Sequence, residues 1–169
     1  MIYLKELNFE NIKEEYEFVS SLKNNENGFE NPCANMTFDE FSTSYFKERM
    51  DYSKGLNLKE GHVSDSHMFL WDDDHIIGLF KIRHYLNDFL KNGPGHIGYI
   101  IKEEHRGKGY ATIGLKLAIE YLINLPDFKE DEVYLSCNIN NPGSLKVMLK
   151  NGGYIDHSDD KEHYVRIKA

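Results

Sequence analysis

The stretch from His105 to Thr112, HRGKGYAT, places two glycines and two basic residues within eight positions. A predicted strand ends before it, near Lys102, and a predicted helix begins near Tyr110. Glycine permits a tight turn whose backbone N–H groups converge, and a helix N-terminus adds unpaired donors and partial positive charge. The stretch therefore favours an anion-binding loop between a strand and a helix. A plain surface turn with solvated basic residues is the alternative.

Two common phosphate-binding motifs do not fit this loop. The P-loop motif needs Lys and then Ser or Thr after its second glycine, whereas Tyr110 follows Gly109 directly. The dinucleotide motif G-x-G-x-x-G needs a third glycine where this chain has Thr112. The spacing thus argues against both nucleotide folds. It also argues against a nucleotide-dependent phosphotransferase, which would need a paired magnesium site as well.

The rest of the chain predicts a single domain over residues 1–169, because no repeat, low-complexity tract or linker interrupts it. Capping patterns place helix starts after Asn11 and Thr37, and a polar loop is expected at 51–66. Two further helices are predicted at 110–125 and 144–151, and alternation predicts strands at 2–7, 67–71, 75–83, 96–102, 133–139, 154–156 and 163–168. Helices and strands in this order predict an α/β (α+β) fold with a mixed sheet.

Segments in the second half of the chain match one family. Residues 106–111, RGKGYA, fit the R/Q-x-x-G-x-G/A segment of the GNAT (GCN5-related N-acetyltransferase) superfamily. Downstream, residues 141–144 (NPGS) resemble that family's N-x-x-S/A segment, and residues 151–154 (NGGY) its G-F/Y junction. The resemblance is specific over 93–156, whereas residues 1–92 agree only in their order of elements. It implies a mainly antiparallel central sheet with helices on both faces, splayed between the family's fourth and fifth strands.

The resemblance implies acetyl-CoA, or a related acyl-CoA, as the donor. The amides of residues 106–111 would then bind the pyrophosphate, and the backbone at 100–102 would pair with pantetheine. Asn141 would contact pantetheine or the acyl group, although capping of the helix before Pro142 is an alternative role. The expected cofactor-binding residues are Ile100, Ile101, Lys102, Arg106, Gly107, Lys108, Gly109, Tyr110, Ala111, Thr112, Asn141 and Ser144.

The catalytic groups are less clearly indicated. Many family members protonate the leaving thiolate with a tyrosine five residues before the G-F/Y aromatic, and this chain has Leu149 there. His96 and His84 are the candidate bases, with a surface or structural role as the alternative for each. Glu103 and Glu104 are expected to be solvated acids at the end of a strand.

Composition limits the other function classes. A net charge of −8 argues against a nucleic-acid partner. The N-terminus is unlike a signal peptide, no apolar run approaches the ~20 residues of a membrane span, and two distant cysteines suit a reducing, cytoplasmic location. No metal is expected, because the histidines lack ligand spacing and the three aspartates at 72–74 read as a hairpin turn.

Two functions remain open at this point. The first is acyl transfer from acetyl-CoA directly to a primary amine of a small molecule, peptide or protein. The second is a CoA-binding module, a sensor or scaffold with little transfer activity, which the missing tyrosine favours. The acceptor would be bound by residues 1–60, by 84–95 and by the last hairpin. Dimers are common in this family, so a homodimer is an option.

Overall fold

The computed structural model describes residues 1–169 and contains two main antiparallel sheets besides a small two-stranded hairpin. The larger has the strand order β1-β4-β5-β6, and the smaller has the order β7-β9-β8. The strands of the two sheets are β1 (Ile2–Glu6), β4 (Asp65–Asp72), β5 (His75–Arg83), β6 (Ile97–Ile101), β7 (Glu132–Asn138), β8 (Tyr154–Ser158) and β9 (Glu162–Lys168). This arrangement confirms the predicted mixed fold with a mainly antiparallel sheet.

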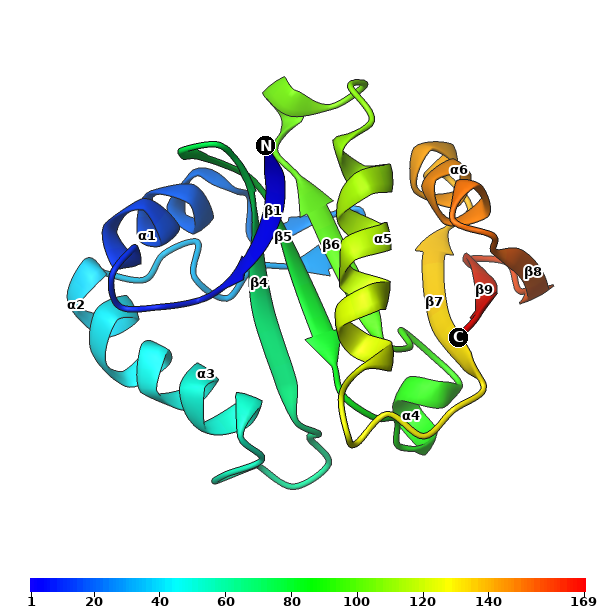
Figure 1. Ribbon diagram of the computed structural model, residues 1–169, viewed down its shortest axis with the longest axis horizontal. Coiled ribbons are helices and arrows are strands. Elements are labelled where there is room, and N and C mark those ends of the chain that lie inside the picture. Colours follow the sequence, from blue (N-terminus) through cyan, green and yellow to red (C-terminus); the bar gives the residue numbers. More distant parts are fainter.

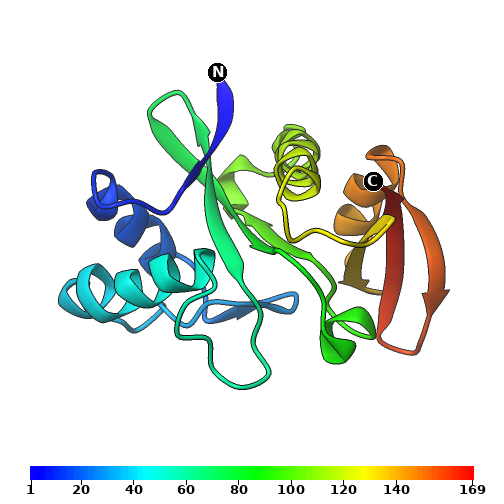
Figure 2. The same ribbon diagram turned by 60° about the horizontal axis from the view of Figure 1, so that its bottom comes forward.

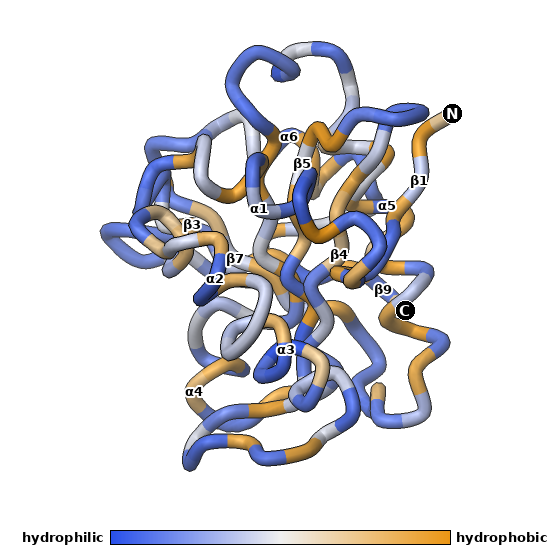
Figure 3. The backbone as a smooth tube through the Cα atoms, turned by 90° about the vertical axis from the view of Figure 1, so that its left-hand side faces the viewer, coloured by the Kyte–Doolittle hydropathy of each residue, from blue (hydrophilic) through white to orange (hydrophobic).

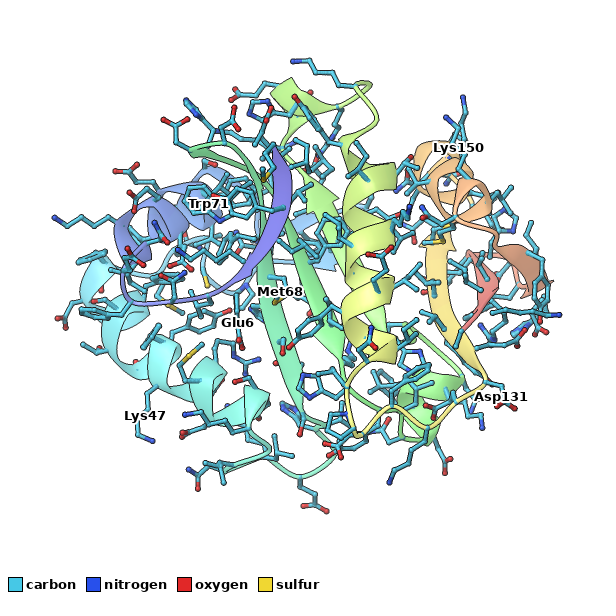
Figure 4. The ribbon with its side chains drawn as sticks, viewed as in Figure 1. Glu6, Lys47, Met68, Trp71, Asp131 and Lys150 are labelled. Carbon is cyan, nitrogen blue, oxygen red and sulfur yellow. The ribbon has the colours of Figure 1, made fainter.

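Helices cover both faces of the larger sheet (Figure 1). Helix α5 (Tyr110–Ile123) lies on one face, while α1 (Ile12–Ser21), α2 (Phe38–Glu40) and α3 (Phe46–Ser53) lie on the other. Side chains alternate accordingly along β4: Met68 joins the core under α5, whereas Trp71 joins the core under α1 (Figure 4). Hydrophobic segments gather in the central strands and in α5, and hydrophilic ones in the outer loops (Figure 3). No helix is both long and apolar enough to cross a membrane.

The predicted helix starts are confirmed, but one of the two caps differs. Thr37 forms the expected capping box with Glu40, each accepting from the other's backbone N–H at 3.1 Å. Asn11 precedes α1 without capping it, because its side chain accepts from the Lys5 ammonium at 2.6 Å instead. The loop predicted at 51–66 is shorter than expected at both ends. It begins later because α3 continues to Ser53, and it ends earlier because β4 begins at Asp65.

A small hairpin was not predicted. Strands β2 (Asn25–Glu26) and β3 (Phe29–Glu30) pair antiparallel around Asn27 and Gly28, whose φ angles are 52° and 87°. Positive φ at both central residues is the type I′ geometry that Asn-Gly favours in two-residue hairpins. The hairpin lies across the face of β5 and β6 that is opposite α5 (Figure 2). It brings residues 26–30 close to the end of β7.

The two sheets meet at one point only. A single bridge joins Gly95 to Leu135, and the His96 N–H donates to the Tyr134 carbonyl at 2.7 Å. Beyond this junction β6 and β7 diverge (Figure 1), and they belong to separate sheets. The predicted opening between these two strands is therefore present.

A buried carboxyl in α1 gives the fold a testable pH dependence. Glu15 is fully buried, and burial raises its pKa from 4.5 to about 8, although it accepts from the Asn8 N–H at 3.0 Å. Between these pH values the folded state binds more protons than the unfolded state, so stability falls as pH rises from 4.5 to 8. Glu15→Gln keeps an acceptor for Asn8 and should gain about 2–4 kcal/mol at pH 8 but little at pH 5. Urea unfolding at both pH values measures this; exposed Glu14→Gln is the control, and an equal gain at pH 5 would contradict the assignment.

Candidate functional site

A cleft of about 730 Å³ occupies the opening between β6 and β7. All of β6 lines one side, and the end of β7 (136–138) with helix α6 (Pro142–Lys150) lines the other. The glycine loop and the start of α5 lie at one end. Residues 26–30 of the hairpin cover the face opposite α5. A Cβ built on Gly28 would lie 3.8 Å from the Asn138 side chain at the end of β7.

The glycine loop has the geometry of an anion site. Gly107 and Gly109 have φ angles of 75° and 83°, and Gly109 precedes the first turn of α5. A Cβ at either glycine would meet no atom within 4 Å, so the space beside the loop is open. The first backbone N–H groups of α5 therefore border the cleft with the partial positive charge of a helix N-terminus.

The structure brings most of the predicted cofactor residues to one cleft. Two predicted positions, Lys102 and Lys108, lie outside the lining. Those that line it are Ile100, Ile101, Arg106, Gly107, Gly109, Tyr110, Ala111, Thr112, Asn141 and Ser144. Their role in binding a cofactor stays a prediction.

Arg106 is engaged within the protein itself. Its Nε donates to the Ile101 carbonyl at 2.8 Å, and its Nη2 donates to the Glu26 carboxylate at 2.9 Å. Glu26 belongs to the hairpin, so an ion pair spanning 80 positions of sequence links the hairpin to the glycine loop. The charge of Arg106 is therefore already paired with the hairpin that covers the cleft.

Helix α6 and strand β6 each contribute one hydroxyl to a pair that borders the cleft. Asn141 caps the helix by accepting from the Ser144 N–H at 3.2 Å, so its alternative role as a helix cap is present. The Ser144 hydroxyl lies 2.8 Å from the Tyr99 hydroxyl, and burial raises the pKa of Tyr99 to about 12. The helix also begins at Pro142, two residues earlier than predicted, because the Asn141 cap starts it there.

Met148 of α6, one residue away from the predicted Leu149, is the buried side chain among the residues of this helix that line the cleft after Ser144. Met148 is 1% exposed and lines the cleft, whereas Leu149 is 42% exposed and does not line it. Neither side chain can donate a proton. Counting back from Tyr154 indicated Leu149 as the position without the usual tyrosine. In the structure the neighbouring Met148 lines the cleft instead, and the usual tyrosine is absent there as well.

The two candidate histidines lie outside the cleft lining. His84 is buried, its Nε2 is 2.8 Å from the Ser66 hydroxyl, and burial lowers its pKa. His96 is fully buried and its Nδ1 accepts from the Tyr134 N–H at 2.9 Å. Burial lowers the pKa of His96 to about 4, against the opposing effect of Glu130. Both rings thus have structural partners, and their role as bases stays a prediction without support from this placement.

Several residues that line the cleft were not singled out from the sequence. They come from the hairpin and from β5, β7 and β9, and they include Glu26, Glu30, Lys81, Arg83, Cys137, Asn138 and Glu162. The Asn27-Gly28 dipeptide was the available signal for the hairpin. No sequence signal indicated that Lys81 and Arg83 of β5 would line the cleft. Their alternation along this segment predicts only a half-buried strand.

Comparison with known proteins agrees with this geometry. Residues 20–153 match the family model described as an acetyltransferase (GNAT) domain. The structure is similar to that of spermidine N-acetyltransferase from Vibrio cholerae in complex with CoA and spermine, with a TM-score of 0.63, 17% identity, and coverage of 99% of this chain and 95% of that one.

Two further solved structures are similar. The ribosomal-protein-S5-alanine acetyltransferase from Vibrio fischeri gives a TM-score of 0.68 at 13% identity, covering 98% of this chain and 91% of that one. A GNAT-family acetyltransferase from Streptococcus pneumoniae gives 0.63 at 13% identity, covering 98% of both chains. No curated protein matches the chain.

Proposed function

Since the chain belongs to the GNAT family of acetyltransferases, we propose that it transfers the acetyl group of acetyl-CoA directly to a primary amine of a small molecule or peptide. The observation that carries the proposal is the cleft between β6 and β7 with the glycine loop at one end. The similar Vibrio cholerae enzyme was solved with CoA and spermine, which supports CoA as the carrier of the acyl group and an amine as the acceptor.

In the proposed complex the residues of the cleft have separate tasks. The N–H groups at the start of α5, flanked by Gly107 and Gly109, bind the pyrophosphate. The edge of β6 that β7 leaves free pairs with the pantetheine chain through its backbone, as an added strand would. Asn141 and Ser144 contact the same chain from α6. The opening between the strands then holds the thioester where an amine can approach from the hairpin side.

Direct transfer needs a neutral amine beside the thioester carbonyl and stabilisation of the charge that develops on its oxygen. Free backbone N–H groups along the diverging part of β6 supply such donors. The carboxylates of Glu30 and Glu162 border the cleft and attract a protonated amine. The amine gives one proton to water before it attacks the carbonyl, and CoA leaves as the thiolate. No cluster of three or more His, Cys, Asp or Glu side chains offers a metal site, and no step of the proposal uses a metal.

A thermal shift assay tests the donor. A ligand present at 100 times its Kd and bound only by the folded state adds about 2.7 kcal/mol of stability. For a domain of this size, acetyl-CoA should then raise Tm by about 5–10 °C, while ATP with Mg²⁺ should leave it unchanged. Stabilisation by ATP together with no effect of acetyl-CoA would contradict the proposal.

A CoA-binding module with little transfer activity is the second candidate. It is favoured by the placement of Met148, which leaves the cleft side of α6 without the usual proton donor. Thiol release from acetyl-CoA, measured over a panel of polyamines, amino acids, aminoglycosides and peptides, separates the two candidates. Binding of acetyl-CoA without turnover on any amine would favour the module. A homodimer and a cytoplasmic location also remain part of the proposal.

A further inference from the structure

Two cations line the cleft on the side away from α5. Lys81 and Arg83 alternate along β5 and therefore project from the same face of the sheet. Leu79 lies on this face as well, and it packs in the core under α1 and α3. The hairpin covers the same face, because the Lys81 ammonium donates to the Glu30 carbonyl and lies 4.5 Å from the Phe29 ring centre.

Neither cation has a carboxylate partner within 4.0 Å in the structure. Lys81 is satisfied only by a backbone carbonyl, and Arg83 donates from Nη1 to the Gly95 carbonyl at 3.0 Å. Asp65 is the cross-strand neighbour of Arg83, but Arg49 holds both of its oxygens at 3.0 and 3.1 Å. Lys81, Arg83 and Arg49 thus share this face with few carboxylates. These are Asp65, Glu48, which already binds Arg49 and Lys59, and the exposed Glu30 of the hairpin.

Such an arrangement is costly without a ligand. Burial, together with the smaller effect of the nearby Arg83, lowers the pKa of Lys81 to about 8. Burial also lowers the pKa of Arg83. Like charges withdrawn from water are disfavoured unless an opposite charge lies between them, and such groups in a cleft are typical of binding sites. In a chain with a net charge of −8, a positive pair inside the cleft is not a general property of the surface.

The position of the pair separates it from the glycine loop. Lys81 is the cross-strand partner of Gly98, and the Arg83 N–H donates to the His96 carbonyl. Lys81 and Arg83 therefore lie beside the beginning of β6. The glycine loop follows the other end of this strand, after Ile101. Gly98 and Ile101 are three residues apart along the strand, which corresponds to about 10 Å. The pyrophosphate of a cofactor held by the loop therefore does not neutralise these two side chains.

We propose that the acyl acceptor is a small amine that also carries an anionic group, a carboxylate or a phosphate, and that Lys81 and Arg83 bind this group. The inference rests on the proposed function and specifies its acceptor. A Cβ at Gly98 would meet no atom within 4 Å, so the space over Gly98, beside the pair, is open. The amino group of the acceptor reaches the thioester over Gly98. A polyamine, which has only positive charges, is a poor acceptor at this site.

Matched acceptor pairs test the proposal, with kcat/KM for thiol release as the readout. Glycine is compared with glycinamide, 4-aminobutyrate with butane-1,4-diamine, and phosphoethanolamine with ethanolamine. The anionic member of at least one pair should be preferred by 10-fold or more. The carboxylate and phosphate pairs show which anion the site takes.

Variants assign the preference to residues. Arg83→Gln should lower kcat/KM for the preferred anionic amine by about 10- to 100-fold, since the variant removes a charge that binds the anion. The value for the counterpart that lacks the anionic group should change by less than about 3-fold. Lys81→Met, which keeps the apolar stem beside Phe29, should show the same selective loss. Lys116→Gln, an exposed cation of α5, controls for the change in net charge. A retained thermal shift with acetyl-CoA shows that each variant is folded.

The outcomes distinguish this inference from the proposed function. A preference for the diamine, or equal losses on both members of a pair in Arg83→Gln and Lys81→Met, would overturn the inference and leave amine acetylation standing. If no amine is acetylated although acetyl-CoA binds, the proposed function is wrong, and the inference with it.

Discussion

Gly109→Asp is expected to weaken acetyl-CoA binding about 100-fold while leaving the protein folded. The residue has a φ of 83° and directly precedes α5, and a side chain there would enter open space rather than the core. A carboxylate at this point would lie against the negative pyrophosphate. At about 5 Å and an effective dielectric constant near 20, each pair of like charges costs about 3 kcal/mol, which corresponds to roughly 100-fold in Kd.

Gly109→Asn is the matched control for this experiment. Asparagine and aspartate have the same size, and both tolerate the left-handed conformation better than other side chains. The neutral amide should therefore keep CoA binding within several-fold of the unmodified protein. Titration calorimetry with CoA measures both variants, and circular dichroism confirms their fold. Equal affinities of the two variants would remove the pyrophosphate from this loop.

Gly95→Ala is expected to destabilise the protein by at least about 3 kcal/mol, since the new methyl group must displace backbone at the junction of the two sheets. Its Cβ would overlap the Tyr134 carbonyl group and lie 3.0 Å from the Leu135 nitrogen. The φ angle of 71° adds strain for any residue with a side chain. For a domain of this size the loss corresponds to a fall in Tm of about 10 °C.

Gly98→Ala, three residues along the chain, provides the comparison. Its Cβ would meet no atom within 4 Å, and its φ angle is not positive. Thermal unfolding should show almost no change for this variant. A fall in Tm of the same size for both alanine variants would mean that the junction is not special, and that any side chain near the start of β6 is harmful.

The part of the fold that the sequence predicted depends on local signals. Helix α5 has a regular apolar face, and the capping box of Thr37 and Glu40 is local chemistry that the fold keeps. The opening between β6 and β7 was expected only through the family resemblance. The hairpin at 25–30 was missed because its two-residue strands are too short to show alternation, and only Asn27-Gly28 indicated them.

The candidate site divides in the same way. The glycine loop is one continuous segment, so its residues are recognisable together. Lys81 on β5 and Glu26 on the hairpin are far apart in the sequence, and both line the cleft because these two elements pack together. No spacing in the sequence encodes that proximity. The choice of His96 and His84 as bases followed from the family resemblance, from residue type and from their positions at strand ends. Their burial and their hydrogen bonds depend on the tertiary structure.

The single junction between the sheets also has a mechanical consequence. Strands β7, β8 and β9 are fastened to the larger sheet at one end of β6 and otherwise through the packing of α5 and α6. A segment held in this way can open as a unit at a lower free energy than the whole domain. A molecule lying along the free edge of β6 acts as a second attachment, so the segment from β7 to β9 is held most firmly when the cleft is full.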